Sequence, residues 1–389
     1  MNTTVKSWDL LRGQYQLLPG AQPAIAGQRP VLGAGRLGHL LCGQRGAQVS
    51  RTLTSVFTLC AHAHRRAAEM ALDCAQQGLP PTPQPAPLHL LETARDHLRS
   101  IALDWPQRLP ECVPAIHTLE WLRGCPLSLV AKPAGVDAAS APDVLERLRA
   151  WLEERVLHEP VSDWLTAHRD PDALSRWCSV QAPGLLPARC LAHGHALAQG
   201  LTPPMRSLDL LDADPARQSA HLSELAQQLA HETEFAQRPT WRGACAETGP
   251  WTRLRHRGRQ MEHSAWTRFS ARWLELVEIA AAPNAAERQG APLLSCGALP
   301  LAQGQALAWC EMARGLLLHW VQLDAQGAVL DYRVLAPTEW NFHPDGALAR
   351  AVSALSPGAT AAAQTLAAAF DPCVACTVQP HAAGASDGT

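Results

Sequence analysis

The heptapeptide FDPCVAC occupies residues 370–376, near the end of a 389-residue chain. Asp followed by Pro is typical of a helix start, because the carboxylate accepts hydrogen bonds from free amides and Pro tolerates the first helical position. Cys373 and Cys376 would then lie on one side of the first turn, where a helix N-terminus favours the thiolate that binds metal. The spacing alone leaves three interpretations open: a metal site, a redox disulfide and two ordinary cysteines.

Composition limits the class of protein. The formal net charge of −2 gives no reason to expect nucleic acid or an anionic membrane surface as a partner. No apolar run approaches the roughly 18 residues of a membrane-spanning helix, and residues 1–14 lack a signal-peptide core. Twelve cysteines scattered through a long chain predict reduced, mostly buried thiols. We therefore expect a cytoplasmic protein with no nucleic-acid partner and no membrane insertion.

Hydrophobic periodicity predicts a mainly helical α+β fold. Apolar residues recur at three- and four-residue steps in six stretches that we predict to be helices: 50–77, 88–103, 143–157, 172–180, 219–235 and 259–281. Gly and Pro stop the first of these, and residues 78–87 are predicted to form a stiff connector. Residues 132–142 and 282–290 are predicted loops, and residues 31–49 a short pair of strands.

The last part of the chain has a different pattern. Residues 306–324 and 328–335 are rich in strand-forming residues and flank a turn at 324–327, which predicts a β-hairpin. The alanine-rich stretches 346–354 and 360–370 are predicted helices that lead into the cysteine pair. We therefore expect a helical body followed by one late hairpin.

Five separated stretches form a pattern: FTLCAHAH at 57–64, ETGP at 247–250 with Arg253, ARG at 313–315 followed by HW at 319–320, PTEWN at 337–341, and FDPCVAC at 370–376. In this order they resemble the large subunits of nickel–iron hydrogenases. The motifs of that family are Cys-Gly-x-Cys-x-x-x-His, Pro-Arg-Gly with His-Trp, Pro-Thr/Ser-Thr-Trp-Asn and Asp-Pro-Cys-x-x-Cys. The match at 247–250 is the weakest, and residues 80–240 have no recognisable counterpart.

The resemblance implies one metal centre. In this family two cysteine pairs hold a nickel and an iron that carries two cyanides and one carbon monoxide. By position, Cys60 and Cys376 match the thiols that bridge the two metals, and Cys373 matches a thiol terminal on nickel. Phe57 stands at the other terminal position and offers no donor atom. Because the nickel set lacks one of its soft ligands, we expect a transiently bound Fe(CN)2(CO) centre and no nickel.

The residues around such a centre are matched in the same way. Bound cyanide leaves an anionic nitrogen, for which the family supplies an Arg and a Ser/Thr, and Arg314 and Thr338 stand at those positions. His64 matches a His that hydrogen-bonds near a bridging thiol. Pro337 and Asp371 belong to the same motifs and complete the predicted cofactor-binding set. A surface ion pair for Arg314 and a turn hydroxyl for Thr338 are the alternative interpretations.

The chain also departs from the family. RLGHL at 36–40 resembles a remnant of Arg-Ile-Glu-Gly-His-Leu, but the Glu used there for proton transfer is missing. The segment between this remnant and Phe57 is shorter than in the family, which argues against docking of a small iron–sulfur subunit. Ala313 replaces the usual Pro, and His381 falls two residues later than the family's final His.

We therefore expect a single reduced large-subunit-like domain over residues 1–389. Its expected parts are a shortened N-terminal segment at 1–49, a helical body at 50–305, the β-hairpin and cysteine motif at 306–381, and a tail at 382–389.

A degenerate large subunit that keeps the iron ligands resembles the hydrogenase expression/formation proteins of the HupK/HoxV type. The resemblance implies a maturation scaffold that is not an enzyme. It would receive the Fe(CN)2(CO) unit from the maturation chaperones that load iron and cyanide, and would deliver it to the apo large subunit of a nickel–iron hydrogenase. Three alternatives stay open: a metal-free assembly platform, a catalytic hydrogenase subunit, and redox chemistry at the Cys373–Cys376 pair.

One further cluster has a spacing that suits Zn2+, namely Cys190, His193 and His195, although no fourth ligand is evident and packing is the alternative. His62 is expected on an exposed helix surface. The remaining cysteines are expected to pack in the core: Cys42, Cys74, Cys112, Cys125, Cys178, Cys245, Cys296 and Cys310.

Overall fold

The computed structural model describes residues 13–32, 35–81, 87–110, 112, 116–129, 139–232, 234–260, 262–282 and 292–380. Over these residues the chain is mainly helical and carries two small β-sheets, so the predicted α+β class is confirmed. His381, the tail at 382–389 and most of the predicted loops at 132–142 and 282–290 lie outside the described residues. No described helix is long and apolar enough to cross a bilayer.

The described helices have the following bounds: α2 (Arg36–Leu41), α3 (Ala47–Val56), α4 (Ala61–Gln77), α5 (Pro87–Arg99), α6 (Trp105–Arg108), α7 (Ala141–Leu152), α8 (Val161–Ala167), α9 (Pro171–Gln181), α10 (Leu186–Ala198), α11 (Pro215–His231), α12 (Pro250–His256), α13 (Ala265–Ala280), α14 (Pro337–Asn341), α15 (Ala347–Ser353) and α16 (Thr360–Phe370). The strands are β1 (Gln14–Leu17), β2 (Ile25–Gln28), β3 (Cys296–Pro300), β4 (Gln305–Met312), β5 (Gly315–Leu323), β6 (Val329–Leu335) and β7 (Ala375–Val378). Short 3₁₀ turns lie at Pro30–Leu32 and Ile116–Leu122, and π-helical turns at Ser100–Asp104 and Glu153–Leu157.

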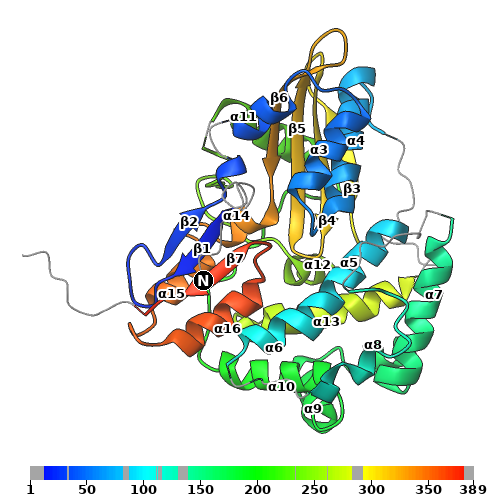
Figure 1. Ribbon diagram of the computed structural model, residues 1–389, viewed down its shortest axis with the longest axis vertical. Helices are drawn as coiled ribbons and strands as arrows, with labels where there is room; N and C mark the ends of the chain where they lie inside the picture. Colours follow the sequence, from blue (N-terminus) through cyan, green and yellow to red (C-terminus); the bar gives the residue numbers. More distant parts are fainter. Residues whose placement is uncertain are drawn as a thin grey trace, which may run out of the picture.

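The larger sheet is antiparallel in the order β3-β4-β5-β6. The predicted hairpin around residues 324–327 is present as β5 and β6. However, the stretch 306–324 is not one strand but two, because the chain reverses at Ala313 and Arg314 between β4 and β5. Helices α3 and α4 lie on one side of this sheet and α11 on the other (Figure 1).

The helical body is built around α13, which packs against α5, α7, α8, α10, α12 and α16. Nearly every residue of α13 is buried. The periodicity at 259–281 predicts this helix but places its start too early. It begins after Ser264, whose hydroxyl accepts a hydrogen bond from the Thr267 amide at 3.2 Å, as an N-cap does.

The smaller sheet has the order β2-β1-β7 and joins the two ends of the described chain. Strand β7 runs parallel to β1, with Cys376 opposite Tyr15. The predicted helix start at Asp371 is therefore wrong. Helix α16 ends at Phe370, Asp371 follows it in the left-handed conformation (φ 45°), and the cysteines lie in a loop and a strand.

Two other local predictions are wrong for related reasons. Residues 31–49 form no strand pair among the described positions, but a 3₁₀ turn and the helices α2 and α3. The predicted helix at 50–77 is interrupted, because α3 ends before Phe57 and α4 begins after Cys60. The predicted helices at 88–103, 143–157, 172–180, 219–235, 346–354 and 360–370 are present within a few residues.

Candidate metal-binding site

A small cavity lies where the α3–α4 junction faces the loop between α16 and β7. Its volume is about 60 Å³, whereas a cavity for a single water needs about 15 Å³, so a group larger than one water can enter it. The lining residues are Arg29, Val56, Phe57, Thr58, Leu59, Cys60, Cys373 and Val374. Two cysteines from opposite ends of the chain therefore share one cavity.

The break between α3 and α4 is what presents Cys60. This cysteine occupies the N-cap position of α4 and makes no side-chain cap. Instead Glu92 on α5 accepts hydrogen bonds from the amides of His62 (2.8 Å) and Ala63 (2.9 Å). Because a carboxylate from another helix satisfies these free amides, the Cys60 thiol remains available for a different partner.

The environment keeps the Cys60 thiol protonated when no metal is bound. Burial raises its pKa well above the usual range, and the negative charges of Cys373 and Glu92 add to this effect, whereas Arg314 lowers the pKa. A metal binds the thiolate, so binding at Cys60 releases a proton.

Cys373 is partly exposed and has a hydroxyl partner. The Thr338 Oγ1 lies 3.1 Å from the Cys373 Sγ. Thr338 is buried at the start of α14, directly after Pro337, which takes the first helical position as its fixed φ allows. The PTEWN motif thus sets a hydroxyl against one thiol of the cavity.

Two side chains, His64 and Arg29, lie against the Phe57 ring that lines the cavity. Its ring stacks on the His64 ring with centroids 4.0 Å apart and an interplanar angle of 4°. The Arg29 guanidinium lies 5.5 Å from the ring centroid, within reach of a cation–π interaction. The position that offers no donor atom is therefore covered by an aromatic ring and a buried cation.

Arg29 is held by a residue that sequence reasoning missed. Its Nη1 lies 3.4 Å from the Glu339 carboxylate, and the Tyr15 hydroxyl donates to the same carboxylate at 3.5 Å. All three side chains are buried. The signal in the sequence is Glu339 itself, which stands in PTEWN where the family motif has Thr.

His64 belongs to a buried chain of polar groups. Its Nδ1 lies 3.0 Å from the His319 Nε2, and the His319 Nδ1 lies 2.7 Å from the Tyr332 hydroxyl. Burial lowers the pKa of His64 well below its usual range and that of His319 to about 3. Both rings are therefore neutral at physiological pH, and His64 supports Phe57.

Arg314 lies within a buried charged layer beneath the cavity. Its Nε donates to the Asp371 carbonyl at 3.2 Å and lies 3.3 Å from the Asp371 carboxylate, while its Nη1 lies 3.6 Å from Asp96. That buried Nη1 has no hydrogen-bond partner among the described residues. Arg314 thus retains donor capacity near the two thiols. Burial alone would lower its pKa, but the negative charges of Asp371 and Asp96 outweigh burial and raise the pKa.

The Asp371 carboxylate pairs with the arginines of this charged layer and does not cap a helix. Besides Arg314, it contacts Arg272 at 3.1 Å and Arg108 at 3.5 Å, and it accepts a hydrogen bond from Ser100 at 3.0 Å. Burial alone would raise its pKa, but the arginines, with Arg314 first, outweigh burial and lower the pKa to about 2. The carboxylate is therefore ionised at neutral pH.

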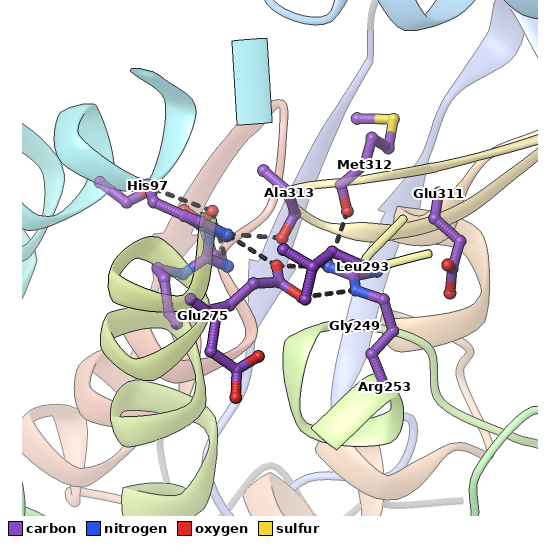
Figure 2. Close-up of polar contacts among 12 residues, drawn as sticks. His97, Gly249, Arg253, Glu275, Leu293, Glu311, Met312 and Ala313 are labelled. Atoms are coloured by element: carbon purple, nitrogen blue, oxygen red, sulfur yellow. Dashed lines mark hydrogen bonds and ion pairs between the residues drawn. The ribbon is translucent and has the colours of Figure 1, made fainter. Parts of the chain in front are cut away.

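A second set of buried charges fixes the turn that carries Arg314 (Figure 2). Glu275 accepts from Arg253 at 2.6 and 2.7 Å and contacts the His97 Nε2 at 2.8 Å. Arg253 also donates to the Met312 carbonyl at 3.1 Å, and Arg272 to the Ala313 carbonyl at 3.4 Å. These bonds tie the end of β4 to α12 and α13.

The weaker ETGP motif at residues 247–250 belongs to the site because its Thr248 contacts the turn between β4 and β5. A Cβ on Gly315, whose φ is 135°, would lie 2.5 Å from the Thr248 Cγ2. The Thr248 Oγ1 accepts from the Leu316 amide at 2.8 Å, and the Asn341 side-chain amide pairs with both backbone groups of Thr248. Three of the motifs therefore pack directly on one another.

Cys376 is not among the residues that line the cavity. It lies on β7, packed against the helical core, and burial raises its pKa to about 11. Its assignment as a bridging thiol remains a prediction.

The three residues on α10 whose spacing suits Zn2+, namely Cys190, His193 and His195, each have a separate partner. The Cys190 Sγ lies 3.6 Å from the Cys112 Sγ. The His193 Nε2 contacts the Pro110 carbonyl at 2.5 Å, and the His195 Nδ1 lies 3.1 Å from the Ser175 hydroxyl. Among the described residues these three side chains form no metal-ligand group.

Comparison with known proteins gives three findings. A family model of nickel-dependent hydrogenases matches residues 251–379. The chain is 38% identical to "Hydrogenase expression/formation protein HoxV" of Cupriavidus necator, over 95% of this chain and 96% of the relative, and 28% identical to "Hydrogenase expression/formation protein HupK" of Rhizobium leguminosarum bv. viciae, over 87% and 88%. Among solved structures, an NAD+-reducing [NiFe]-hydrogenase in the H2-reduced state matches with a TM-score of 0.49 and 17% identity, over 90% of this chain and 92% of that chain.

Proposed function

The chain belongs to the family of hydrogenase expression/formation proteins that includes HoxV and HupK, and from this premise we propose that it is a maturation scaffold that carries the Fe(CN)2(CO) unit as cargo. It receives this unit from the chaperones that load iron and cyanide. It then delivers the unit to the apo large subunit of a nickel–iron hydrogenase. The chain itself performs no turnover.

One observation carries this proposal. The thiols of Cys60 and Cys373, which come from opposite ends of the chain, line the same small cavity. Thiolates are the soft ligands that suit iron with strong diatomic ligands. In our proposal these two cysteines bind the cargo iron, and Cys376 is the third candidate ligand, two positions beyond the lining residue Val374.

The cyanide groups need hydrogen-bond donors in a buried site. Arg314 has an Nη1 without a hydrogen-bond partner among the described residues, and its charge acts on both Cys60 and Cys373. The Thr338 hydroxyl already contacts the Cys373 thiol. We propose that these two groups donate to the cyanide nitrogens, while Pro337 and Asp371 hold them in position.

The same cavity disfavours nickel. Phe57 offers no donor atom, and Arg29 places a buried cation over its ring. A second metal cation would face this guanidinium at short range in a medium that screens charge poorly. We therefore propose that the cavity accepts the iron unit alone, whose negatively charged cyanides and thiolates the Arg29 cation favours.

Release of the cargo follows from the same features. Few thiolates hold the iron, and Cys373 is partly exposed. A thiolate that leaves the iron takes up a proton, so reprotonation of Cys60 accompanies dissociation. A partner that docks over the Cys373 side is thus able to take the iron by thiol exchange.

Iron retention tests the proposal. The full chain is co-expressed with the hydrogenase maturation machinery, purified without oxygen, and analysed for iron. We expect about one iron per chain, and C60A, C373A and C376A variants that each lose most of it. C74A is the matched control, because Cys74 is a buried thiol on the same helix as His64. Full iron retention in C60A or in C373A would overturn the ligand assignment, and no iron in any sample would favour the metal-free platform.

A further inference from the structure

We propose that the chain has a second metal site, in which Cys296, Cys310 and His89 bind Zn2+ as three protein ligands. It does not depend on the cargo site. The ligand atoms of these three residues all lie within 4.8 Å of one another, and no other group of His, Cys, Asp or Glu among the described residues is so arranged. Sequence reasoning assigned both cysteines to core packing.

Strand pairing brings the two thiols together. Cys296 on β3 is the register partner of Cys310 on β4, so both side chains leave the same face of the sheet. His89 approaches that face from α5. Its Nδ1 lies 3.9 Å and its Nε2 3.5 Å from the Cys310 Sγ. In a tetrahedral zinc site with ordinary bond lengths, sulfur and nitrogen ligands are about 3.6 Å apart. The His89 ring therefore has to turn before Nδ1, rather than Nε2, is the nitrogen that faces the Cys310 thiol.

A backbone carbonyl sets the tautomer of the His89 imidazole. The His89 Nε2 contacts the Glu311 carbonyl, and a backbone carbonyl can only accept, so this nitrogen carries the proton. The Nδ1 lone pair is then free for a metal. Ligating histidines commonly donate their other N–H to a backbone carbonyl in this way, which fixes both tautomer and ring orientation.

Charge and access also suit a divalent cation. Two thiolates and one neutral imidazole match the charge of Zn2+, and Arg66, which hydrogen-bonds to Cys296, is a further positive group beside these thiols. Cys296 is only partly buried, which gives the metal a path of entry and leaves a fourth position for solvent.

The proposed metal would join the two halves of the fold near the cargo cavity. His89 and Glu92 are one turn apart on α5, which belongs to the helical core, whereas β3 and β4 belong to the sheet. Glu92 caps the N-terminus of α4 next to Cys60. A metal at His89 therefore fixes the helix that supplies this cap.

Cobalt binding tests the site. Co2+ is titrated into the reduced full chain in a C60S/C373S/C376S background, so that the cargo cysteines cannot contribute. We expect one Co2+ per chain, with thiolate charge-transfer and tetrahedral d–d bands that zinc displaces. Adding C296S, C310S or H89Q should weaken binding at least tenfold, whereas adding C74S, a buried thiol in the same core, should not.

Circular dichroism identifies any variant that fails to fold, and the three ligand variants provide independent readings. Absence of a thiolate–cobalt band in the background chain would overturn the proposal. So would a band that survives both C296S and C310S. Either result leaves the iron-retention test of the cargo site unaffected.

Discussion

Replacing Asp371 by Asn removes the negative charge around which three arginines gather. Asp371 lies 3.1 Å from Arg272 and 3.3 Å from Arg314, and all three side chains are buried. The fall of the Asp371 pKa from 3.8 to about 2 corresponds to about 2 kcal/mol of stabilisation at neutral pH. Leaving two buried guanidinium groups without their partner adds to this, so we expect a loss of about 3–5 kcal/mol.

The assay is urea unfolding of the metal-free chain, followed by circular dichroism at pH 7. In a thermal melt of the same 389-residue chain, this loss corresponds to a fall of about 4–6 °C in the melting temperature, if the unfolding entropy per residue is of ordinary size. D345N is the matched control, because the Asp345 side chain is 86% exposed. Because the Asp371 pKa is depressed, its contribution is complete above about pH 4 and disappears as the pH falls to about 2. A D371N loss below about 1 kcal/mol at pH 7 would refute the reasoning, since it lies under the range for breaking a buried pair.

Three further predictions concern the surrounding structure. Burial lowers the pKa of His97 to about 4 and that of His319 to about 3. Below about pH 6.5 the unfolded chain therefore binds protons at these histidines that the folded chain does not bind. These two histidines should together remove about 3 kcal/mol of stability for each pH unit between about pH 6 and 4, and H97Q and H319Q variants whose urea midpoints fall as steeply as the unchanged chain's over this range would contradict this. G315A should cost about 3 kcal/mol or more, because the added Cβ meets Thr248 in a strained backbone, whereas G78A, in open space, should cost about 1 kcal/mol in the same thermal melt. F57C should not confer hydrogen uptake, because the Arg29 cation remains; gas consumption with stoichiometric nickel would show otherwise.

Local patterns in the sequence predicted the elements better than their connections. The alanine-rich stretch 360–370 is α16 to the residue, and the turn at 324–327 joins β5 to β6. The helix start predicted from Asp371 and Pro372 was wrong, because a carboxylate that caps a helix and one that pairs with three arginines can have the same local sequence. Only tertiary contacts from α6, α13 and the β4–β5 turn decide between the two roles of Asp371.

The candidate site was predicted in part. The motifs indicated Cys60, Cys373 and Thr338, which the fold brings to one cavity or its edge. Arg29 was not predicted, because its segment resembles no motif and its partner Glu339 lies at the other end of the chain. The approach of Cys296 to Cys310 depends on strand register, which no residue spacing specifies. Long-range pairing of this kind leaves no periodic signal.

Infrared spectroscopy tests the central claim most directly. Cyanide and carbon monoxide bound to iron absorb where the polypeptide does not, so the full chain purified from a host with the hydrogenase maturation machinery gives an unambiguous spectrum. We predict two cyanide bands and one carbonyl band, all lost in C60A and kept in C74A. A spectrum without these bands, from protein that contains no iron, would contradict the claim that this chain carries the Fe(CN)2(CO) unit.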